Sequence, residues 1–215
     1  RDVAVTGVQT CALPIYLGIS ITYAVEDSPL GTGGAIANAS RLLTIQEDES
    51  ILIFNGDVLS AHDLESQIKL HEQSKADVTL HLTELDDARV YGCVPLDSQG
   101  RVLEFLEKME NPKAKTINAG CYIFHERAIR EIPTQTVVSV ERDTFPKLLQ
   151  DKFAIYGYCD QKYWIDMGNS QFTGQVLLST VGDIRQPKSE KYETVSNLPF
   201  VTEEFGELLK QSEEQ

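Results

Sequence analysis

Short apolar, β-branched runs alternate with amphipathic stretches of helical spacing through the middle of the chain. The runs that predict strands are 19–24, 51–54, 77–85, 117–124, 153–159 and 163–165. The stretches that predict helices are 35–43, 63–74, 139–150 and 169–180. Strands and helices alternate early, whereas an antiparallel hairpin over 93–106 comes later. This order predicts a mixed sheet in an α/β sandwich.

Asp57 follows directly after one of these strands. The run Ile51–Phe54 is short, apolar and β-prone, which is typical of a strand buried on both faces of a parallel sheet. It ends at Asn55-Gly56-Asp57, where Gly56 permits a sharp change of backbone direction. Ligands bind at this edge of open α/β sheets, and a carboxylate there is well placed to hold Mg²⁺ against phosphates. An Asx-turn or a helix N-cap explains the motif equally well.

A glycine-rich loop, Pro29-Leu30-Gly31-Thr32-Gly33-Gly34-Ala35, precedes the first predicted helix. A turn of this kind at the start of a helix presents free backbone N–H groups to an anion or to the edge of a base. It is not a Walker A loop, because no Gly-Lys-Ser/Thr follows. Glycine-rich turns are common, so the loop alone indicates only a candidate binding site.

Further charged residues stand at strand ends. Asp166 follows the run 163–165, and Glu107-Lys108 follows the second strand of the hairpin. If the strands before Asp57 and Asp166 run the same way in one sheet, both carboxylates reach one crevice. Two carboxylates that converge on Mg²⁺ suit phosphoryl or nucleotidyl transfer. Glu107 would accept hydrogen bonds from sugar hydroxyls and Lys108 would neutralise a phosphate, whereas the alternative is an exposed surface pair.

The composition narrows the classes of partner. The net charge of −14 argues against a nucleic-acid backbone as ligand. No apolar run approaches ~18 residues, so we expect no membrane-spanning helix. The cysteines form no Cys-x-x-Cys pair, and we therefore expect a cytoplasmic protein without disulfides or structural zinc. We interpret the four histidines as surface or structural residues because they show no metal-ligand spacing: His62, His71, His81 and His125.

The two ends of the chain differ from its middle. Residues 1–16 lack an initiator methionine and a signal-peptide pattern and resemble translated adapter sequence, so we expect a non-native segment there. A genuine short strand and loop is the alternative. Residues 17–185 would form one domain. Residues 186–215 are acidic with only small apolar clusters, and we expect them to form a C-terminal tail.

An ordered set of motifs gives the middle of the chain a family resemblance. The motifs are the glycine-rich loop, Phe54-Asn55-Gly56-Asp57, Tyr91-Gly92, Phe105-Leu106-Glu107-Lys108, Asn118-Ala119-Gly120 and Trp164-Ile165-Asp166-Met167-Gly168. In this order they resemble the sugar-phosphate nucleotidyltransferase family over about residues 17–180. Residues 139–146 resemble its mannose-1-phosphate guanylyltransferase branch. The resemblance implies a Rossmann-like, glycosyltransferase-A-type three-layer sandwich with a mixed, mainly parallel sheet.

The resemblance also implies a reaction. A sugar 1-phosphate, here mannose 1-phosphate, would attack the α-phosphorus of a nucleoside triphosphate, here GTP, to give GDP-mannose and pyrophosphate. Asp57 and Asp166 would hold Mg²⁺ and, with Lys108, form the catalytic set. The residues that would bind substrate are Leu30, Gly31, Thr32, Gly56, Gly92, Glu107 and Asn118. Two further motif residues, Arg142 and Asp143, receive no role.

Within the substrate-binding set, the loop at Gly31 would contact the base and ribose. Gly92, Glu107 and Asn118 would contact the sugar, and Lys108 would contact its phosphate. No nucleic acid or membrane is expected as a partner, and a homo-oligomer is left open.

Departures from the family pattern leave alternatives open. The family begins with a strand and a glycine-rich loop that ends in Arg, and residues 1–16 do not match it. We therefore expect an incomplete fragment of a domain that is truncated at its N-terminus. A non-catalytic regulatory relative that binds nucleotide sugar, or a glucose-1-phosphate thymidylyl- or uridylyltransferase, is the alternative. A transferase that uses a ready-made nucleotide sugar would need an Asp-x-Asp triplet after a strand, and Asp57-Val58-Leu59 does not supply one.

Overall fold

The computed structural model describes residues 2–6, 20–85, 88–89, 91–160, 163–166 and 177–180. Its strands are β1 (Asp2–Thr6), β2 (Ser20–Ala24), β3 (Ser50–Phe54), β4 (Val58–Ser60), β5 (Val78–Glu84), β6 (Thr116–His125), β7 (Ile155–Cys159), β8 (Tyr163–Asp166) and β9 (Leu177–Thr180). Its helices are α2 (Gly31–Ser40), α3 (Leu64–Ser74), α4 (Glu126–Ile129), the π-helical turn η1 (Val140–Thr144) and α5 (Phe145–Gln150). The strands predicted between residues 19 and 165 are confirmed, with ends shifted by one or two residues.

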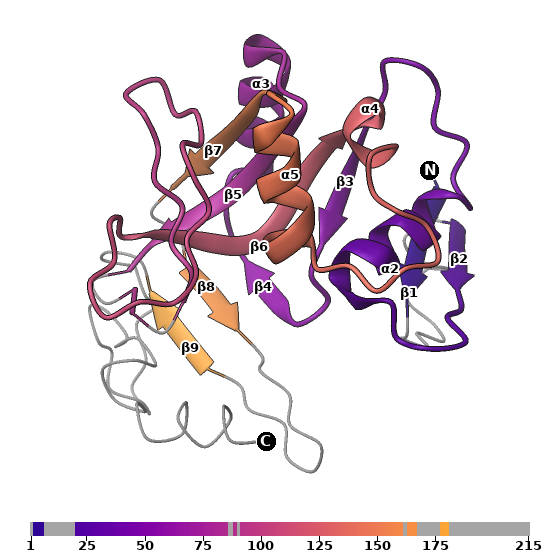
Figure 1. Cartoon of the computed structure of the whole chain (residues 1–215), viewed down its shortest axis with the longest axis horizontal. Helices are drawn as coiled ribbons and strands as arrows, with labels where there is room; N and C mark the ends of the chain where they lie inside the picture. Colours follow the sequence, from indigo (N-terminus) through magenta and orange to yellow (C-terminus); the bar gives the residue numbers. More distant parts are fainter. Residues whose placement is uncertain are drawn as a thin grey trace, which may run out of the picture.

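A four-stranded sheet in the order β3-β6-β5-β7 forms the centre of the molecule (Figure 1). Strand β6 pairs antiparallel with both β3 and β5, whereas β5 pairs parallel with β7. Strands β3, β5 and β7 therefore point the same way and β6 points the opposite way. This confirms a mixed sheet in which most strands share one direction.

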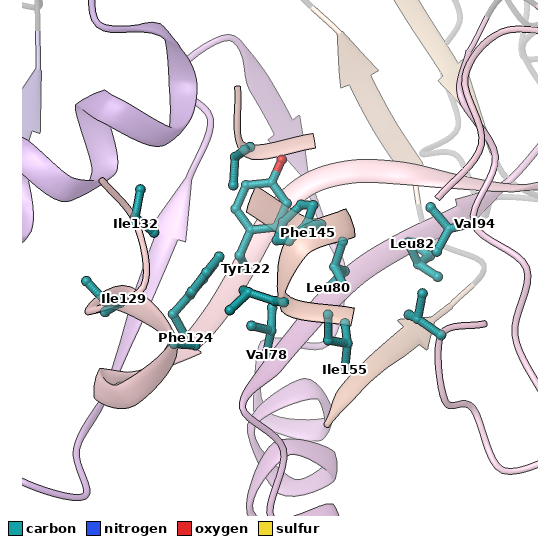
Figure 2. Packing of buried hydrophobic residues seen from close by; sticks show 14 of the residues in the cluster. Val78, Leu80, Leu82, Val94, Tyr122, Phe124, Ile129, Ile132, Phe145 and Ile155 are labelled. Atoms are coloured by element: carbon teal, nitrogen blue, oxygen red, sulfur yellow. The ribbon is translucent and has the colours of Figure 1, made fainter. Parts of the chain in front are cut away.

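The two faces of β5 are covered by different helices, which makes the fold a three-layer sandwich. Its Val78 and Leu80 pack with Phe145 of α5 in the main apolar core (Figure 2). The Phe145 ring stacks on Phe105 with ring centroids 5.1 Å apart. On the opposite face, the Thr79 hydroxyl lies 2.9 Å from Nδ1 of a histidine in α3. Successive residues of a strand face opposite sides, so β5 is buried on both.

Strand β3 corrects one expectation. It was predicted to be buried on both faces, but its residues alternate between exposed and half-buried. Leu52 is 42 % exposed and Phe54 is 56 % exposed. Among the described strands β3 pairs only with β6, so it forms an edge of the sheet, and its neighbour is antiparallel. An apolar run shows that a strand forms but does not show whether both of its faces are covered.

Two smaller sheets complete the described part of the chain. Strands β4, β8 and β9 form an antiparallel sheet. The strand that ends at Asp166 therefore lies in a different sheet from β3, although the sequence had suggested that both strands share one sheet. The helix predicted to reach Thr180 is also wrong at its end, because Leu177–Thr180 is strand β9. Antiparallel pairing with β8 favours the extended conformation of this apolar segment over the helix that its spacing suggested.

The expected terminal segments are described only in part. Residues 2–6 form β1, which pairs in parallel with β2, with Asp2 opposite Ser20 and Thr6 opposite Ala24. The rest of the expected non-native segment and the expected tail over 186–215 lie outside the described residues. The assignments of a non-native segment and of a C-terminal tail both stay predictions. Within the described residues, no helix combines the length and the apolar character that crossing a membrane requires.

Two buried histidines, one in α3 and one in β5, lie where this helix packs on the sheet, in agreement with a structural role. His71 lies between the hydroxyls of Ser50 and Thr79, with each ring nitrogen 2.9 Å from one oxygen. His81 stacks on His62, with ring centroids 4.0 Å apart. Burial lowers the pKa of His71 to about 4. Burial and then the charge of His62 lower the pKa of His81 to about 4, although Asp160 opposes the shift.

We expect the free energy of unfolding to fall as the pH is lowered from about 6.5 towards 4. In this range the unfolded chain binds protons at both histidines and the folded chain does not, so acid favours unfolding. For His81 alone the loss between pH 7 and pH 5 is about 2 kcal/mol. Urea unfolding at the two pH values measures the loss. NMR titration of the His81 ring checks its cause, and a ring that titrates near 6.5 would contradict it.

Candidate active site

The backbone puts Asp166 beside the residue that follows Asp57, through a strand pairing that the sequence did not suggest. Strand β3 ends at Phe54, the chain turns through residues 55–57, and β4 begins at Val58. Val58 pairs directly with Asp166, the last residue of β8. Asp57, which is exposed, is therefore the neighbour of the residue that faces Asp166. The antiparallel pairing of β4 with β8 thus puts the backbone of Asp166 beside the residue that follows Asp57, without a common parallel sheet.

The turn that carries Asp57 packs tightly on a second motif. The Asn55 N–H donates to the Gly120 carbonyl at 2.8 Å. Gly120 has φ of +76°, and a Cβ there would lie 3.0 Å from Asn55 Nδ2 and 3.1 Å from a methyl of Val58. Glycine is needed at position 120 for both its conformation and its space. The close approach fixes the turn against the Asn118-Ala119-Gly120 motif.

Gly56 does not have the special backbone conformation that was expected of it. Its φ is not positive, so the turn does not use the conformational freedom of glycine. A Cβ at Gly56 would meet no atom within 4 Å among the described residues, and the residue is exposed. Among the described residues, the space at Gly56, next to Asp57, is therefore open.

Trp164 anchors β8 to β6 and to Tyr91. Its side chain is buried, and its indole Nε1–H donates to the Ala119 carbonyl at 3.3 Å. Tyr91 packs edge-on against the indole, with ring centroids 6.2 Å apart. These contacts belong to a second apolar cluster that joins β4, β6 and β8. Trp164 thus ties the strand that ends in Asp166 to the Tyr91-Gly92 motif and to β6.

The hairpin places Gly92 against the segment that carries Glu107 and Lys108. Cys93 and Leu106 exchange backbone hydrogen bonds of 2.9 and 3.0 Å. A Cβ at Gly92 would lie 2.7 Å from the Leu106 carbonyl oxygen, so only glycine fits at this position. The pairing ends at Leu106, and both Glu107 and Lys108 are exposed beyond it. Because the strand ends there, the two side chains need not point to opposite faces.

Two predicted sugar-site residues contact the π-helical turn η1. The Asn118 Nδ2 group donates to Glu141 and, at 2.7 Å, to the buried Tyr122 hydroxyl. Glu107 pairs with Arg142, whose Nε lies 3.5 Å from Oε1 of the carboxylate. Burial raises the pKa of Tyr122 above its ordinary value, and the charge of Glu141 adds to the rise, so the phenol stays neutral. The structure therefore connects Glu107 and Asn118 through adjacent residues of one turn.

The glycine-rich loop corrects another expectation. Its N–H groups were expected to be free for a ligand, but those of Gly33 and Gly34 donate to the Val138 carbonyl at 2.8 and 3.3 Å. The Val140 N–H in turn donates to Thr32 Oγ1 at 2.9 Å. Gly31 has φ of +71°, and a Cβ there would lie 2.7 Å from the Val138 oxygen. The start of α2 therefore binds residues 138–140 of the chain itself.

Sequence reasoning assigned no role to Glu141, Arg142 or Tyr122, which the structure connects to Asn118 and Glu107. Arg142 lies within the branch-specific motif, so that motif was the available signal. The helix predicted over 139–150 is in fact η1 followed by α5, with Pro146 in the first turn of α5. A π-helical turn cannot be read from helical periodicity, because its wider register is decided by packing.

Comparison with known proteins identifies the family. The family described as "Nucleotidyl transferase" matches residues 9–176. The chain belongs to this family. Its expected resemblance to the sugar-phosphate nucleotidyltransferases, and among them to mannose-1-phosphate guanylyltransferase, is confirmed.

Two curated relatives show the degree of similarity. The chain is 49% identical over 156 residues to the mannose-1-phosphate guanylyltransferase of Mycobacterium tuberculosis, a match covering 72% of this chain and 43% of the relative. It is 39% identical over 154 residues to the D-glycero-alpha-D-manno-heptose 1-phosphate guanylyltransferase of Aneurinibacillus thermoaerophilus, covering 71% of this chain and 64% of the relative. The chain thus spans about half the length of the curated relatives that it matches.

Solved structures confirm the expected Rossmann-like, glycosyltransferase-A-type fold. The crystal structure of HddC from Yersinia pseudotuberculosis complexed with GMP-PN matches with a TM-score of 0.58 and 28% identity, over 68% of this chain and 61% of that chain. Another HddC structure from the same organism matches with a TM-score of 0.60 and 25% identity, over 77% and 71% of the two chains.

Proposed function

We propose that this chain is part of a sugar-1-phosphate guanylyltransferase, which condenses a sugar 1-phosphate with GTP to give a GDP-sugar and pyrophosphate. The observation that supports the proposal is the pairing of Val58 with Asp166, since Val58 directly follows Asp57 in the chain. The names of both curated relatives support guanylyl transfer to a manno-configured sugar phosphate. Mannose 1-phosphate is the substrate we infer.

In the proposed reaction an oxygen of the sugar phosphate forms a bond to the α-phosphorus of GTP. The bond from that phosphorus to the bridging oxygen breaks, and pyrophosphate leaves with the electron pair. The protein supplies no covalent nucleophile. Its residues would hold the two anionic substrates in line for the reaction. Positive charge around them would offset the repulsion between the two anions.

Asp57 and Asp166 fit a magnesium site. Mg²⁺ prefers oxygen ligands, and in phosphoryl-transfer sites one or two carboxylates hold it together with water and phosphate oxygens. Asp57 is exposed in the turn after β3, and its neighbour Val58 pairs with Asp166 in the register of β4 and β8, which supports a shared site. The described residues contain no cluster of three or more His, Cys, Asp or Glu that resembles a metal site, so substrate oxygens would complete this one. Bound there, Mg²⁺ would neutralise phosphate charge as the transfer proceeds.

The remaining predicted residues divide between the two substrates. Glu107, Asn118 and Gly92 would bind the sugar, and Lys108 would bind its phosphate. Leu30, Gly31 and Thr32 would contact the base and ribose. Because Val138 accepts hydrogen bonds from Gly33 and Gly34, the nucleotide would meet the first residues of the loop instead of these two N–H groups. We propose that the enzyme acts in the cytoplasm, in line with cysteines that form no Cys-x-x-Cys pair.

The test is Mg²⁺-dependent pyrophosphate release from mannose 1-phosphate. The assay is run with GTP, ATP, UTP, CTP and dTTP, on the 215-residue chain and on the complete product of its gene. We expect GTP to be the preferred nucleotide for the complete protein, with no release when EDTA replaces Mg²⁺. Release with another nucleotide but not GTP would overturn the assignment of the base. No release, with GDP-mannose still bound, would favour a regulatory relative.

A further inference from the structure

Asn118 uses its entire amide in contacts within the protein. Its Nδ2 group donates to the Tyr122 hydroxyl and to Glu141, and its Oδ1 accepts from the Gly120 N–H at 3.1 Å. An amide nitrogen has two hydrogens to donate, so both are occupied. A sugar hydroxyl that is to bind Asn118 through Nδ2 must therefore replace one of these two partners.

Of the two partners, Glu141 is the one that can be replaced. Tyr122 is fully buried, and its phenol lies inside the main core. Glu141 is exposed on η1, and its carboxylate has further acceptor capacity beyond the contact with Asn118. A ligand can approach the Asn118–Glu141 contact from solvent, whereas it cannot approach the Asn118–Tyr122 contact without opening the core.

The turn that carries Glu141 is held firmly in place. Ser139 Oγ accepts from the Arg142 N–H at 3.2 Å, and Asp143 accepts from the Ser139 N–H at 2.8 Å. Val140 and Thr144 are buried on the inner side of the turn. These contacts fix the backbone that carries Glu141, so only the side chain of Glu141 has to be ordered to reach Asn118.

We propose that Glu141 and Asn118 together bind one hydroxyl group of the sugar. The hydroxyl would enter between the two side chains, donate its hydrogen to the Glu141 carboxylate and accept a hydrogen bond from Asn118 Nδ2. A hydroxyl can do both at once, whereas an ether, a carbonyl or a hydrogen atom cannot. Glu141 is thus a specificity-determining residue of the sugar site. This inference rests on the proposed function, since it requires that a sugar 1-phosphate binds beside Asn118.

The experiment measures binding of mannose 1-phosphate and its 2-, 3-, 4- and 6-deoxy analogues to the 215-residue chain by isothermal titration calorimetry. In the unchanged chain, one analogue is expected to bind about tenfold more weakly than mannose 1-phosphate, because a charge-assisted hydrogen bond is lost. Glu141→Ala should lower the affinity for mannose 1-phosphate by about the same factor and leave the affinity for that analogue unchanged. Glu141→Gln, which keeps an acceptor of the same shape, should fall in between.

Glu131→Ala serves as the matched control, because Glu131 is also an exposed glutamate but pairs with Lys147, 3.2 Å away. This variant should leave the affinities for mannose 1-phosphate and its four analogues unchanged. Glu141→Ala could instead weaken the binding of all five ligands equally, or of none. In either case Glu141 and Asn118 do not share a sugar hydroxyl, whereas sugar binding itself is not contradicted. If the unchanged chain binds no sugar 1-phosphate, this inference fails, whereas the proposed function fails only if the complete gene product also releases no pyrophosphate.

Discussion

Asp166→Asn is expected to lower the turnover of the complete enzyme by about 10³-fold while leaving its fold intact. The substitution keeps the size of the side chain and removes one negative charge, which weakens the hold on Mg²⁺ where phosphate charge must be neutralised. A loss of about 4 kcal/mol of transition-state stabilisation corresponds to that factor. Asp57→Asn should have a similar effect, because we propose that both carboxylates hold the same ion and Val58, which follows Asp57, pairs with Asp166.

The measurement is kcat at increasing Mg²⁺ concentration, together with thermal unfolding of each variant. Higher Mg²⁺ should restore part of the activity of both variants. Asp151→Asn is the control, since this exposed aspartate at the end of α5 pairs with Lys147 and lies outside the proposed site. Turnover of Asp166→Asn close to that of the unchanged enzyme would refute the role in metal binding.

Lys108→Ala is expected to raise the KM for the sugar phosphate about 10- to 100-fold and to change the KM for GTP little. Lys108 directly follows Glu107 beyond the end of the hairpin pairing, where both side chains are exposed. The loss of one charged hydrogen bond to a phosphate accounts for the factor. Initial rates with each substrate varied in turn separate the two KM values.

Lys69→Ala provides the comparison, because Lys69 is an exposed lysine of α3 whose partner is Glu65 of the same helix. Neither KM should change in that variant. If Lys108→Ala instead raises the KM for GTP more than that for the sugar phosphate, Lys108 binds the nucleotide and our assignment is wrong.

Much of the local structure followed from the sequence because it depends on neighbours along the chain. Helix α3 was expected over 63–74, and Asp63 caps it by accepting a hydrogen bond from the Ser66 N–H at 3.0 Å. The hairpin turn at residues 97–100 closes through a hydrogen bond of 2.9 Å from the Asp97 N–H to Arg101. Alternating apolar residues located β5, and an apolar run located β6, for the same reason.

The candidate site was predicted as a set of motifs, but its connections were not. Asn118 and Glu107 were expected in a sugar site, whereas their contacts with Glu141 and Arg142 come from a turn more than twenty residues away along the chain. The free N–H groups expected in the glycine-rich loop are bound by Val138, a partner more than one hundred residues later. Periodicity and turn chemistry describe only near neighbours, so they contain no information on such partners.

Composition, periodicity and motif order were enough to establish an α/β fold, the family, and which residue types stand at the ends of strands. Tertiary structure alone decided that β3 lies at an edge, that the residue after Asp57 pairs with Asp166, and that Glu141 reaches Asn118. The physical reason is that a strand or a turn forms from local preferences. Its neighbours are chosen by which distant surfaces bury apolar area and pair their hydrogen-bonding groups together.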